Sequence, residues 1–425
     1  MDVKGCQSLW LRWQSMVEAE PQAMAVQEAA GGAVWTRASL ASAAEALPRC
    51  HGPAVVSGKG VPFLAAVLRG FRDGVPLLLQ DLPGPLPAPL RDLPVGTGVV
   101  KTTSGSTGQR RYVLCSAAQL AADAASICST MKLRREWPNI AVISMSHSYG
   151  FSNLVLPLLL HGVPLIHVSS PLPGAMAQAL ALTDRCVLPA VPAMWRAWQN
   201  AGLPTARIAL AISAGAALPL ALESAVYENS GLKIHNFYGS SECGGIAYDA
   251  SDVPRTDPAC AGKPMDGVQL SVNENGHLQV RSKAVAMGYL EPDPSLSGGL
   301  FQSTDMADLR EGQVFLTGRT GDTINSAGRK IAPGIIEEAL QGIPGIQHCV
   351  VFGVPSIDPL RGEEIIACLR LFPGFRLQEV REQASGRLPA GHVPRSWREC
   401  PDLEPDARGK ISRVFWRERW VKEER

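Results

Sequence analysis

The chain has 425 residues, of which 46% are hydrophobic, and it carries 40 basic against 39 acidic side chains. This length exceeds what a single ordinary hydrophobic core serves, so it predicts two domains or more. The formal net charge of +1 gives no reason to expect nucleic acid or an anionic membrane as a partner.

Three features predict a cytoplasmic protein without membrane insertion. Polar residues, among them Asp2, Lys4 and Arg12, interrupt the N-terminal stretch, so we expect no export signal. The most apolar stretch, residues 208–222, contains a glycine and a proline and is shorter than the roughly 18 residues of a spanning helix, so it predicts a buried strand and a turn. The ten cysteines form no CxxC pair, which favours free, reduced thiols.

Residues 53–240 alternate short apolar runs with amphipathic stretches. The apolar runs include AVVS, PLLLQ, NIAVIS, PLIHV, CVLPAV, IALAIS and LKIHNFYG, most of them bounded by Gly, Pro or Ser. Runs of this length with helical pieces between them predict parallel strands joined by crossover helices. The proline-rich segment at 81–94 is predicted to be a rigid surface connection.

The sequence pattern changes twice after this region. Residues 262–317 are punctuated by turns and predict β-structure, whereas the residues after GRTGD (318–322) predict a helix, two strands and a second helix. We therefore expect an α/β fold with a large domain over residues 1–320 and a small α+β domain over 321–425.

The first candidate site is VGTGVVKTTSGSTGQRRYVLCS at 95–116, which predicts a strand, a turn rich in Gly, Ser and Thr, and a second strand. Backbone N–H groups freed by glycines can bind a polyphosphate together with the hydroxyl groups. The stretch lacks the Gly-Lys-Ser/Thr of a P-loop. Its residues alone are equally compatible with a phosphate-binding loop and with an ordinary turn or flexible linker.

The second candidate is HNFYGSSECGG at 235–245, which ends an apolar strand. Tyr238 can stack on a purine, Ser241 can donate to a phosphate, and Glu242 can bind a hard cation such as Mg²⁺. The alternative is an ordinary turn with a solvated glutamate.

Two further candidates lie downstream. Asp305, in FQSTDMADL, can accept hydrogen bonds from both hydroxyls of a ribose. Lys410, in DARGKISR, lies beside a glycine near the C-terminus, where a solvated surface lysine is the alternative.

Taken together and in this order, the four stretches resemble the signature motifs of the acyl-adenylate-forming superfamily. This superfamily comprises acyl- and aryl-CoA synthetases, adenylation domains of nonribosomal peptide synthetases, and beetle luciferases. The matching segments are 103–111, 238–242, Asp305, 318–337 and 409–413. The resemblance covers residues from about 98 to 413.

The resemblance implies a two-step reaction and a fold. A carboxylate attacks the α-phosphate of Mg-ATP to give an acyl-adenylate and pyrophosphate, and a thiol then displaces AMP to give a thioester. The implied fold is a large N-terminal domain with mostly parallel sheets, crossover helices and a β subdomain, followed by a small mobile α+β domain. That domain is expected to rotate about Gly321 between the two steps.

The resemblance also implies roles for individual residues. Lys410, Ser241 and Glu242 would be catalytic, with Glu242 binding Mg²⁺. His147 and Gly215 would line the acyl pocket. The phosphates of ATP would be bound by Thr103, Ser104, Gly105, Ser106, Thr107, Gly108 and Arg111. Adenine and ribose would be bound by Ala216, Ala217, Asn236, Phe237, Tyr238, Gly239, Asp305 and Arg319.

The chain departs from the family pattern at several positions. Arg110 and Arg111 stand where the family loop has Pro and Lys, and arginine keeps the positive charge in a larger, planar group. Gly321 stands where the family hinge is often Asp or Lys, and glycine allows wide backbone rotation. The region before the loop is also shorter than in many members.

The absence of an aspartate near His147 narrows the predicted class of substrate. Amino-acid-activating members carry an Asp near His147 to pair with the substrate ammonium, and residues 144–159 contain none. We therefore expect a fatty or aryl acid. For the acceptor thiol, CoA is favoured because it is the commoner acceptor in the family. The alternatives are the phosphopantetheine arm of an acyl carrier protein, or a family member that binds nucleotide without catalysis.

Overall fold

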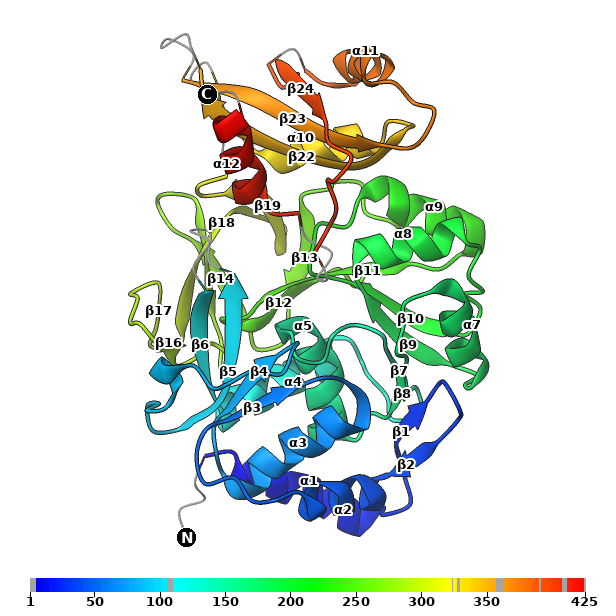
Figure 1. Ribbon diagram of the computed structural model, residues 1–425, viewed down its shortest axis with the longest axis vertical. Coiled ribbons are helices and arrows are strands. Elements are labelled where there is room, and N and C mark those ends of the chain that lie inside the picture. The colour runs from blue at the N-terminus through cyan, green and yellow to red at the C-terminus, as the bar shows by residue number, and fades with distance from the viewer. Residues whose placement is uncertain are drawn as a thin grey trace.

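The computed structural model describes residues 5–104, 110–322, 324–326, 329–356, 362–389, 391–406 and 411–423. The molecule is elongated (Figure 1), with the N-terminal helices at one end and residues 333–423 as a separate layer at the other. Two sheets with helices between them fill the space below this layer.

Within the described ranges, fourteen strands join into one long sheet whose middle part is parallel. Its order is β14 (Gln269–Val272), β15 (His277–Arg281), β18 (Leu300–Arg310), β19 (Gln313–Arg319), β13 (Cys260–Pro264), β12 (Gly244–Tyr248), β11 (Ile234–Ser240), β10 (Ile208–Ser213), β9 (Cys186–Ala190), β7 (Asn139–Ala141), β8 (Leu165–His167), β1 (Met24–Glu28) and β2 (Val34–Thr36), with β17 (Leu296–Ser297) paired to β18. Strands β7 to β11 pair in parallel, as the apolar runs predict. Strands β11 to β19 pair antiparallel, which confirms the predicted β-rich region.

A second sheet brings the first candidate loop against the β-rich region. Its order is β16 (Gly288–Tyr289), β6 (Arg110–Ser116), β5 (Thr97–Ser104), β4 (Leu77–Gln80) and β3 (Ala54–Ser57). Strands β5 and β6 form an antiparallel hairpin in which Thr103 faces Arg111. Both predicted strands of this candidate are confirmed, and the residues between them, 105–109, lie outside the described part of the chain.

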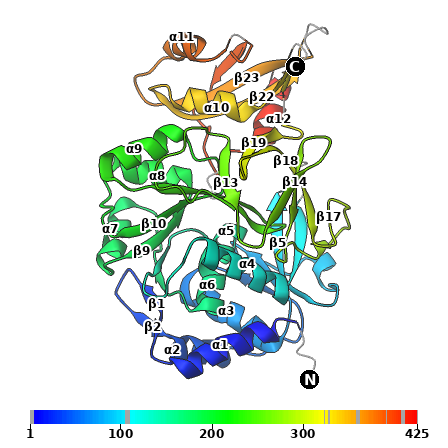
Figure 2. The same cartoon turned by 180° about the vertical axis from the view of Figure 1, so that it is seen from behind.

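Helices cover the sheets in two sets. The helices are α1 (Gln7–Ala19), α2 (Arg37–Ala46), α3 (Gly60–Asp73), the short 3₁₀ turn η1 (Ala88–Leu90), α4 (Ala117–Thr130), α5 (Ser148–Gly150), the π-helical turn η2 (Phe151–Val155), α6 (Leu156–His161), α7 (Pro173–Ala181), α8 (Pro192–Asn200) and α9 (Leu220–Ser230). Helices α3, α4 and α6 share the core between the two sheets, whereas α7, α8 and α9 pack on the outer face of β7–β11 (Figures 1 and 2).

Local sequence explains where several helices begin and end. Ser116 and Gln119 form a reciprocal capping box at the start of α4. Pro173 and Pro192 occupy the first turn of α7 and α8, where the missing N–H has no helical partner in any case. Gly74, at φ +67°, ends α3 in the left-handed conformation that favours glycine.

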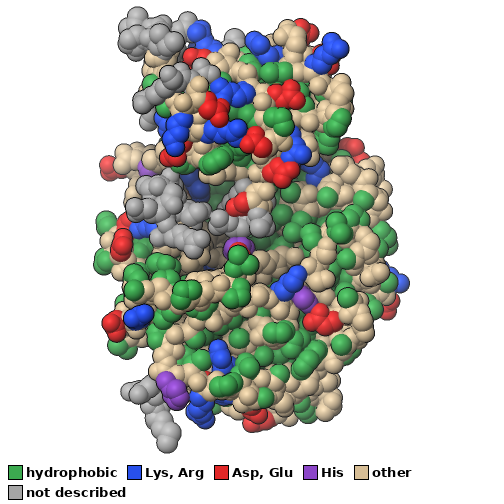
Figure 3. All heavy atoms as spheres, in the orientation of Figure 1, with side chains coloured by type: hydrophobic (Ala, Val, Ile, Leu, Met, Phe, Trp, Pro, Cys, Tyr) green, Lys and Arg blue, Asp and Glu red, His purple; other side chains and the backbone are tan. Residues whose placement is uncertain are grey.

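The C-terminal layer has cores of its own. Strands β22 (Ile346–Pro355), β23 (Glu363–Leu371) and β24 (Ser396–Glu399) form a sheet with α10 (Pro333–Gln341) and α11 (Leu377–Arg387) on one face and α12 (Arg413–Glu423) on the other. Alternate residues of β22 enter the two cores: Val351 packs toward α10 and α11, and Val350 and Phe352 toward α12. On the face drawn in Figure 3, charged side chains gather over this layer.

This layer contains the predicted helix, two strands and helix, and it adds β24 and α12, which the sequence analysis did not predict. A small hairpin, β20 (Ile324–Ser326) and β21 (Arg329–Ile331), precedes it. The domain boundary at 320/321 stays a prediction.

The predicted absence of a membrane-spanning helix agrees with the structure as far as it is described. Over these ranges, no helix is long and apolar enough to cross a membrane. The apolar stretch 208–222 forms β10, a turn and the first residues of α9, and all ten cysteines have free thiols.

Candidate active site

The candidate residues gather where β10 and β11 end. These strands are parallel neighbours, so their carboxyl ends meet at one edge of the sheet, where open α/β folds bind ligands. After the buried end of β10, Gly215, Ala216 and Ala217 are exposed, and Gly215 has a φ of +85°. The predicted adenine-binding alanines therefore lie on an exposed turn that follows a buried strand.

Tyr238, Asp305 and Arg319 meet although they are distant in sequence. The Tyr238 hydroxyl donates to Asp305 Oδ2 at 2.6 Å, and Arg319 Nε donates to Asp305 Oδ1 at 2.6 Å. Burial and the Asp305 charge raise the pKa of Tyr238 well above its usual value, so the phenol stays a donor. The arrangement joins β11 to the β18–β19 hairpin and fixes the carboxylate predicted to hold a ribose.

The other residues of β11 alternate between the two faces of the strand. Asn236 donates to the Cys260 carbonyl at 3.3 Å, whereas Phe237 is buried against Tyr149, with ring centroids 5.9 Å apart. A Cβ added to Gly239 would lie 2.7 Å from the Gly244 carbonyl oxygen, so only glycine fits this turn. The predicted nucleotide contacts of Phe237 and Gly239 would therefore come from their backbone.

Ser241 and Glu242 lie in the turn that follows β11. Ser241 Oγ is 2.6 Å from Ser148 Oγ, at the start of the α5–α6 helical segment. Glu242 Oε1 accepts from the Tyr289 hydroxyl at 3.0 Å, and burial together with the Glu242 charge raises the pKa of Tyr289. No partner is recorded for Glu242 Oε2 among the residues that the structure describes.

These contacts fit the predicted magnesium site. Mg²⁺ is usually held by one or two carboxylates together with phosphates and waters. Glu242 supplies one such carboxylate, and no group of three His, Cys, Asp or Glu side chains that could hold a metal occurs in the described ranges. Binding of Mg²⁺ by Glu242 stays a prediction.

Arg111 reaches the same place from β6. Its guanidinium lies 3.4 Å from the centroid of the Tyr289 ring, and its Nη2 is 2.6 Å from Asp293 Oδ2. Hydrogen bonds from Ser295 and the ion pair with Arg111 lower the pKa of Asp293. Contacts therefore connect Arg111 through Tyr289 to Glu242. The contact of Arg111 with phosphate stays a prediction.

Several predicted residues cannot be placed in this arrangement. Gly105, Ser106, Thr107, Gly108 and Lys410 lie outside the described residues. Thr103 and the backbone of Ser104 lie at the end of β5, opposite β6. Gly321 is exposed, two residues after Arg319.

One residue that sequence reasoning missed is Asp81. His147 Nε2 is 2.7 Å from Asp81 Oδ2, while the hydroxyls of Ser144 and Ser146 donate to Oδ1 at 2.8 and 2.5 Å. The hydrogen bond from His147, followed by those from the serines, holds the pKa of Asp81 well below its usual range. The segment containing Asp81 is therefore more than a surface connection, because it brings a carboxylate to the predicted acyl pocket.

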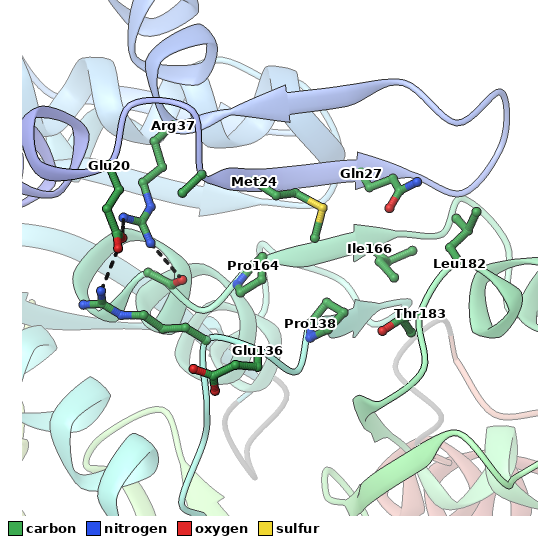
Figure 4. Close-up of a pocket in the computed structure, with 13 residues that line it drawn as sticks. Glu20, Met24, Gln27, Arg37, Glu136, Pro138, Pro164, Ile166, Leu182 and Thr183 are labelled. Atoms are coloured by element: carbon green, nitrogen blue, oxygen red, sulfur yellow. Dashed lines mark hydrogen bonds and ion pairs between the residues drawn. The ribbon is translucent and has the colours of Figure 1, made fainter.

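A cavity of about 450 Å³ lies elsewhere, between β1, α2 and β8 (Figure 4). Glu20 forms ion pairs there with Arg37 at 2.5 Å and with Arg135 at 3.5 Å. None of the predicted site residues lines this cavity, so we assign the site from the side-chain contacts at the strand ends.

The chain matches two family models, "AMP-binding enzyme" over residues 97–290 and "AMP-binding enzyme C-terminal domain" over residues 335–410. It is 29% identical over 349 residues to a feruloyl-CoA synthase from Amycolatopsis sp., covering 75% of this chain and 70% of that protein. Among solved structures, ATP-bound MatB from Rhodopseudomonas palustris superposes with a TM-score of 0.84 at 18% identity, covering 97% of this chain and 99% of that one.

A second solved structure gives the same result. The o-succinylbenzoate CoA synthetase from Bacillus subtilis, in complex with its acyl-adenylate intermediate, superposes with a TM-score of 0.82 at 17% identity, covering 95% of this chain and 97% of that one. At this level of identity the likeness establishes a shared fold: a large α/β domain with parallel sheets and a small C-terminal α+β domain.

Proposed function

The chain belongs to the AMP-binding enzyme family of adenylate-forming ligases, and from this premise we propose that it converts a fatty or aryl acid into its CoA thioester. The acid would first become an acyl-adenylate, with release of pyrophosphate, and CoA would then displace AMP. The observation that carries the proposal is the convergence of Tyr238, Asp305 and Arg319 at the edge of the sheet.

The described contacts support the nucleotide and metal side of the first step. Asp305, held by Tyr238 and Arg319, would present its carboxylate to a ribose diol. The exposed turn at Ala216 and Ala217 lies at the adjoining end of β10. Ser241 and Glu242 lie together in the turn after β11, where a hydroxyl and a metal ligand would meet the α-phosphate. Mg²⁺ held by Glu242 would neutralise charge on the phosphates.

The choice of acid rests on the pocket beside His147. The structure supplies a carboxylate there, Asp81, although the stretch 144–159 itself contains none. Both oxygens of Asp81 already accept hydrogen bonds, from His147, Ser144 and Ser146. We keep a fatty or aryl acid as the proposed substrate, and the panel of acids below tests whether Asp81 admits an amino acid. Relatives with names such as feruloyl-CoA synthase and 2-succinylbenzoate–CoA ligase support CoA as the acceptor.

The test is exchange of radiolabelled pyrophosphate into ATP with a panel of fatty, aryl and amino acids. We expect exchange that depends on a fatty or aryl acid and on Mg²⁺, and none with amino acids. Thioester formation is then measured with CoA and, separately, with a phosphopantetheinylated acyl carrier protein. Exchange with amino acids alone would overturn the proposed acid, and thioester formation on the carrier protein alone would overturn CoA.

A further inference from the structure

The contact between Asp81 and His147 has the form of a carboxylate–imidazole dyad. Asp81 follows β4 and His147 precedes α5, so two separate parts of the chain meet at this pair. Because the carboxylate accepts three hydrogen bonds at 2.5–2.8 Å, its position and its negative charge are fixed by the surrounding donors.

This geometry determines which ring nitrogen of His147 is free to accept a proton. An ionised carboxylate can only accept, so the nitrogen at 2.7 Å from it, Nε2, must carry a proton. In the neutral imidazole, Nδ1 is then the acceptor. His147 makes no side-chain capping hydrogen bond at α5, and no partner is recorded for Nδ1 in the described part of the chain. The side chain is 30% exposed, so a ligand can approach it.

The backbone of the dyad connects directly to the predicted α-phosphate site. Ser148, the next residue after His147, contacts Ser241 with 2.6 Å between the two Oγ atoms. His147 is therefore one position along the chain from the residue that contacts Ser241, the residue predicted to contact the α-phosphate.

We propose that His147 is the general base of the thioester-forming step and that Asp81 is its positioning residue, an inference that rests on the proposed function. The thiol proton moves to Nδ1 of His147 as the sulfur attacks the acyl carbonyl carbon. A C–S bond forms, the bond between that carbon and the phosphate oxygen breaks, and AMP leaves. Asp81 stabilises the imidazolium that results, and the proton then passes to solvent.

The size of the expected effect follows from the thiol. A thiol with the reference pKa of cysteine, about 8.5, is only a few per cent ionised at pH 7, so assisted deprotonation can gain roughly 30-fold or more there. General bases typically contribute about 10²–10⁴-fold. We therefore expect loss of the Asp81 charge to slow the thioester step by about 10- to 100-fold at pH 7.

The experiment separates the two half-reactions. Asp81→Asn keeps an oxygen acceptor for Nε2 but removes the charge, and His147→Ala removes the base. The matched control is Asp92→Asn, which makes the same substitution at an exposed aspartate of the same segment. Pyrophosphate exchange measures adenylation, and CoA added to pre-formed acyl-adenylate measures thioester formation, with the acid selected by the panel.

With the acid at saturating concentration, we expect both dyad variants to lose at least about 10-fold more of thioester formation than of pyrophosphate exchange at pH 7. At pH 9.5, where a far larger share of the free thiol is ionised than at pH 7, the loss should be at least about fivefold smaller. The ionisable group recorded in contact with His147 is Asp81; Glu242, in the turn after Ser241, is bonded to Tyr289. An equal loss at both pH values, an equal loss in pyrophosphate exchange, or no loss would overturn the inference.

A second measurement needs no substrate. In ¹⁵N-histidine NMR spectra at pH 8, with the resonance assigned by its absence in His147→Ala, we expect protonated Nε2 and unprotonated Nδ1. A proton on Nδ1 would overturn the dyad. Absence of pyrophosphate exchange in the unaltered protein with every acid of the panel would instead overturn the proposed function, and the inference with it.

Discussion

At the scale of single residues, His161 shows how burial overrides a local preference. It ends α6, where the helix dipole favours a positive charge. Burial, helped by the nearby charges of Arg12 and Arg135, lowers its pKa to about 4. In the described part of the chain, its Nε2 is buried without a hydrogen-bond partner. The desolvation cost therefore exceeds the dipole's contribution, and the imidazole is neutral at pH 7.

This environment predicts that acid destabilises the fold through His161. The unfolded chain binds a proton near pH 6.5, whereas the folded chain binds it only near pH 4, so stability falls as the pH drops through that window. The side chain is only half-buried, so we reduce the effect for solvent screening to about 1–2 kcal/mol. In urea unfolding, the free energy of unfolding of His161→Gln should fall by about 1 kcal/mol less between pH 7.5 and 5 than that of the unaltered protein. The control is His51→Gln, at an exposed position, and an unchanged pH dependence in His161→Gln would contradict the prediction.

At the scale of elements, the sequence located the strands that are buried on both faces. β4, β9 and β10 appear as apolar runs because both of their faces meet helices or other core residues. β24 and α12 were missed for the opposite reason. β24 has the sequence SWRE with partly exposed side chains at a sheet edge, and α12 buries Trp416 alone among mostly charged residues.

The residues of the candidate site also fall into those that the sequence predicts and those that it does not. Motif residues such as Tyr238 and Asp305 could be named from short stretches, and the structure brings these two into contact across 67 positions. The contact of Asp81 with His147 could not be predicted, because neither residue carries a local pattern that refers to the other. Sequence spacing constrains neighbours along a strand or helix, whereas this pair depends on where β4 ends in three dimensions.

Arg413, the first residue of α12, connects this helix to α10 and β22 of the C-terminal layer and to Asp322, which precedes the layer. Its guanidinium donates to Asp322 Oδ2 at 2.5 Å, to Glu337 Oε2 of α10 at 2.8 Å and to the Val351 carbonyl of β22 at 2.8 Å. Lys410 lies three residues earlier, outside the described residues. We expect Arg413 to fix the start of α12 and so to hold the segment that carries Lys410.

Arg413→Ala should therefore slow acyl-adenylate formation by about 10-fold or more while thioester formation from pre-formed acyl-adenylate changes less. The reference is Lys410→Ala, for which we expect a several-hundred-fold loss, roughly 3–4 kcal/mol. Arg413→Lys keeps the charge but loses the planar fork, so it should be only partly active. The control is Arg417→Ala on the same helix, whose partly exposed ion pair with Glu363 contributes at most about 1 kcal/mol. Equal losses in both half-reactions would show that Arg413 supports folding rather than position.

At the scale of the whole molecule, the C-terminal layer touches the large domain through α10. Arg196 of α8 donates to Gln341 at 3.2 Å, and Glu338 accepts from the backbone of Leu220 at the start of α9. Burial at this contact raises the pKa of Glu338. Two polar contacts of this kind are compatible with rotation between two orientations, because a weak contact is easily exchanged for another.

Gly321, the predicted hinge, has a φ of +88° in the observed orientation. An added Cβ would meet no atom within 4 Å, so space is open there and the backbone angle alone favours glycine. Proline requires a φ near −65°. Gly321→Pro should therefore exclude the observed orientation, and Gly321→Ala should disfavour it by about 1 kcal/mol.

Under the predicted rotation of the small domain between the two half-reactions, excluding one orientation should stop one of them. We expect Gly321→Pro to lose either pyrophosphate exchange or thioester formation from pre-formed acyl-adenylate by at least about 10-fold, while the other half-reaction continues. Gly321→Ala should show a smaller loss in the same half-reaction. Circular dichroism and thermal unfolding would establish that the variants are folded. If both half-reactions of the folded proline variant run at the rates of the unaltered protein, Gly321 is not the hinge.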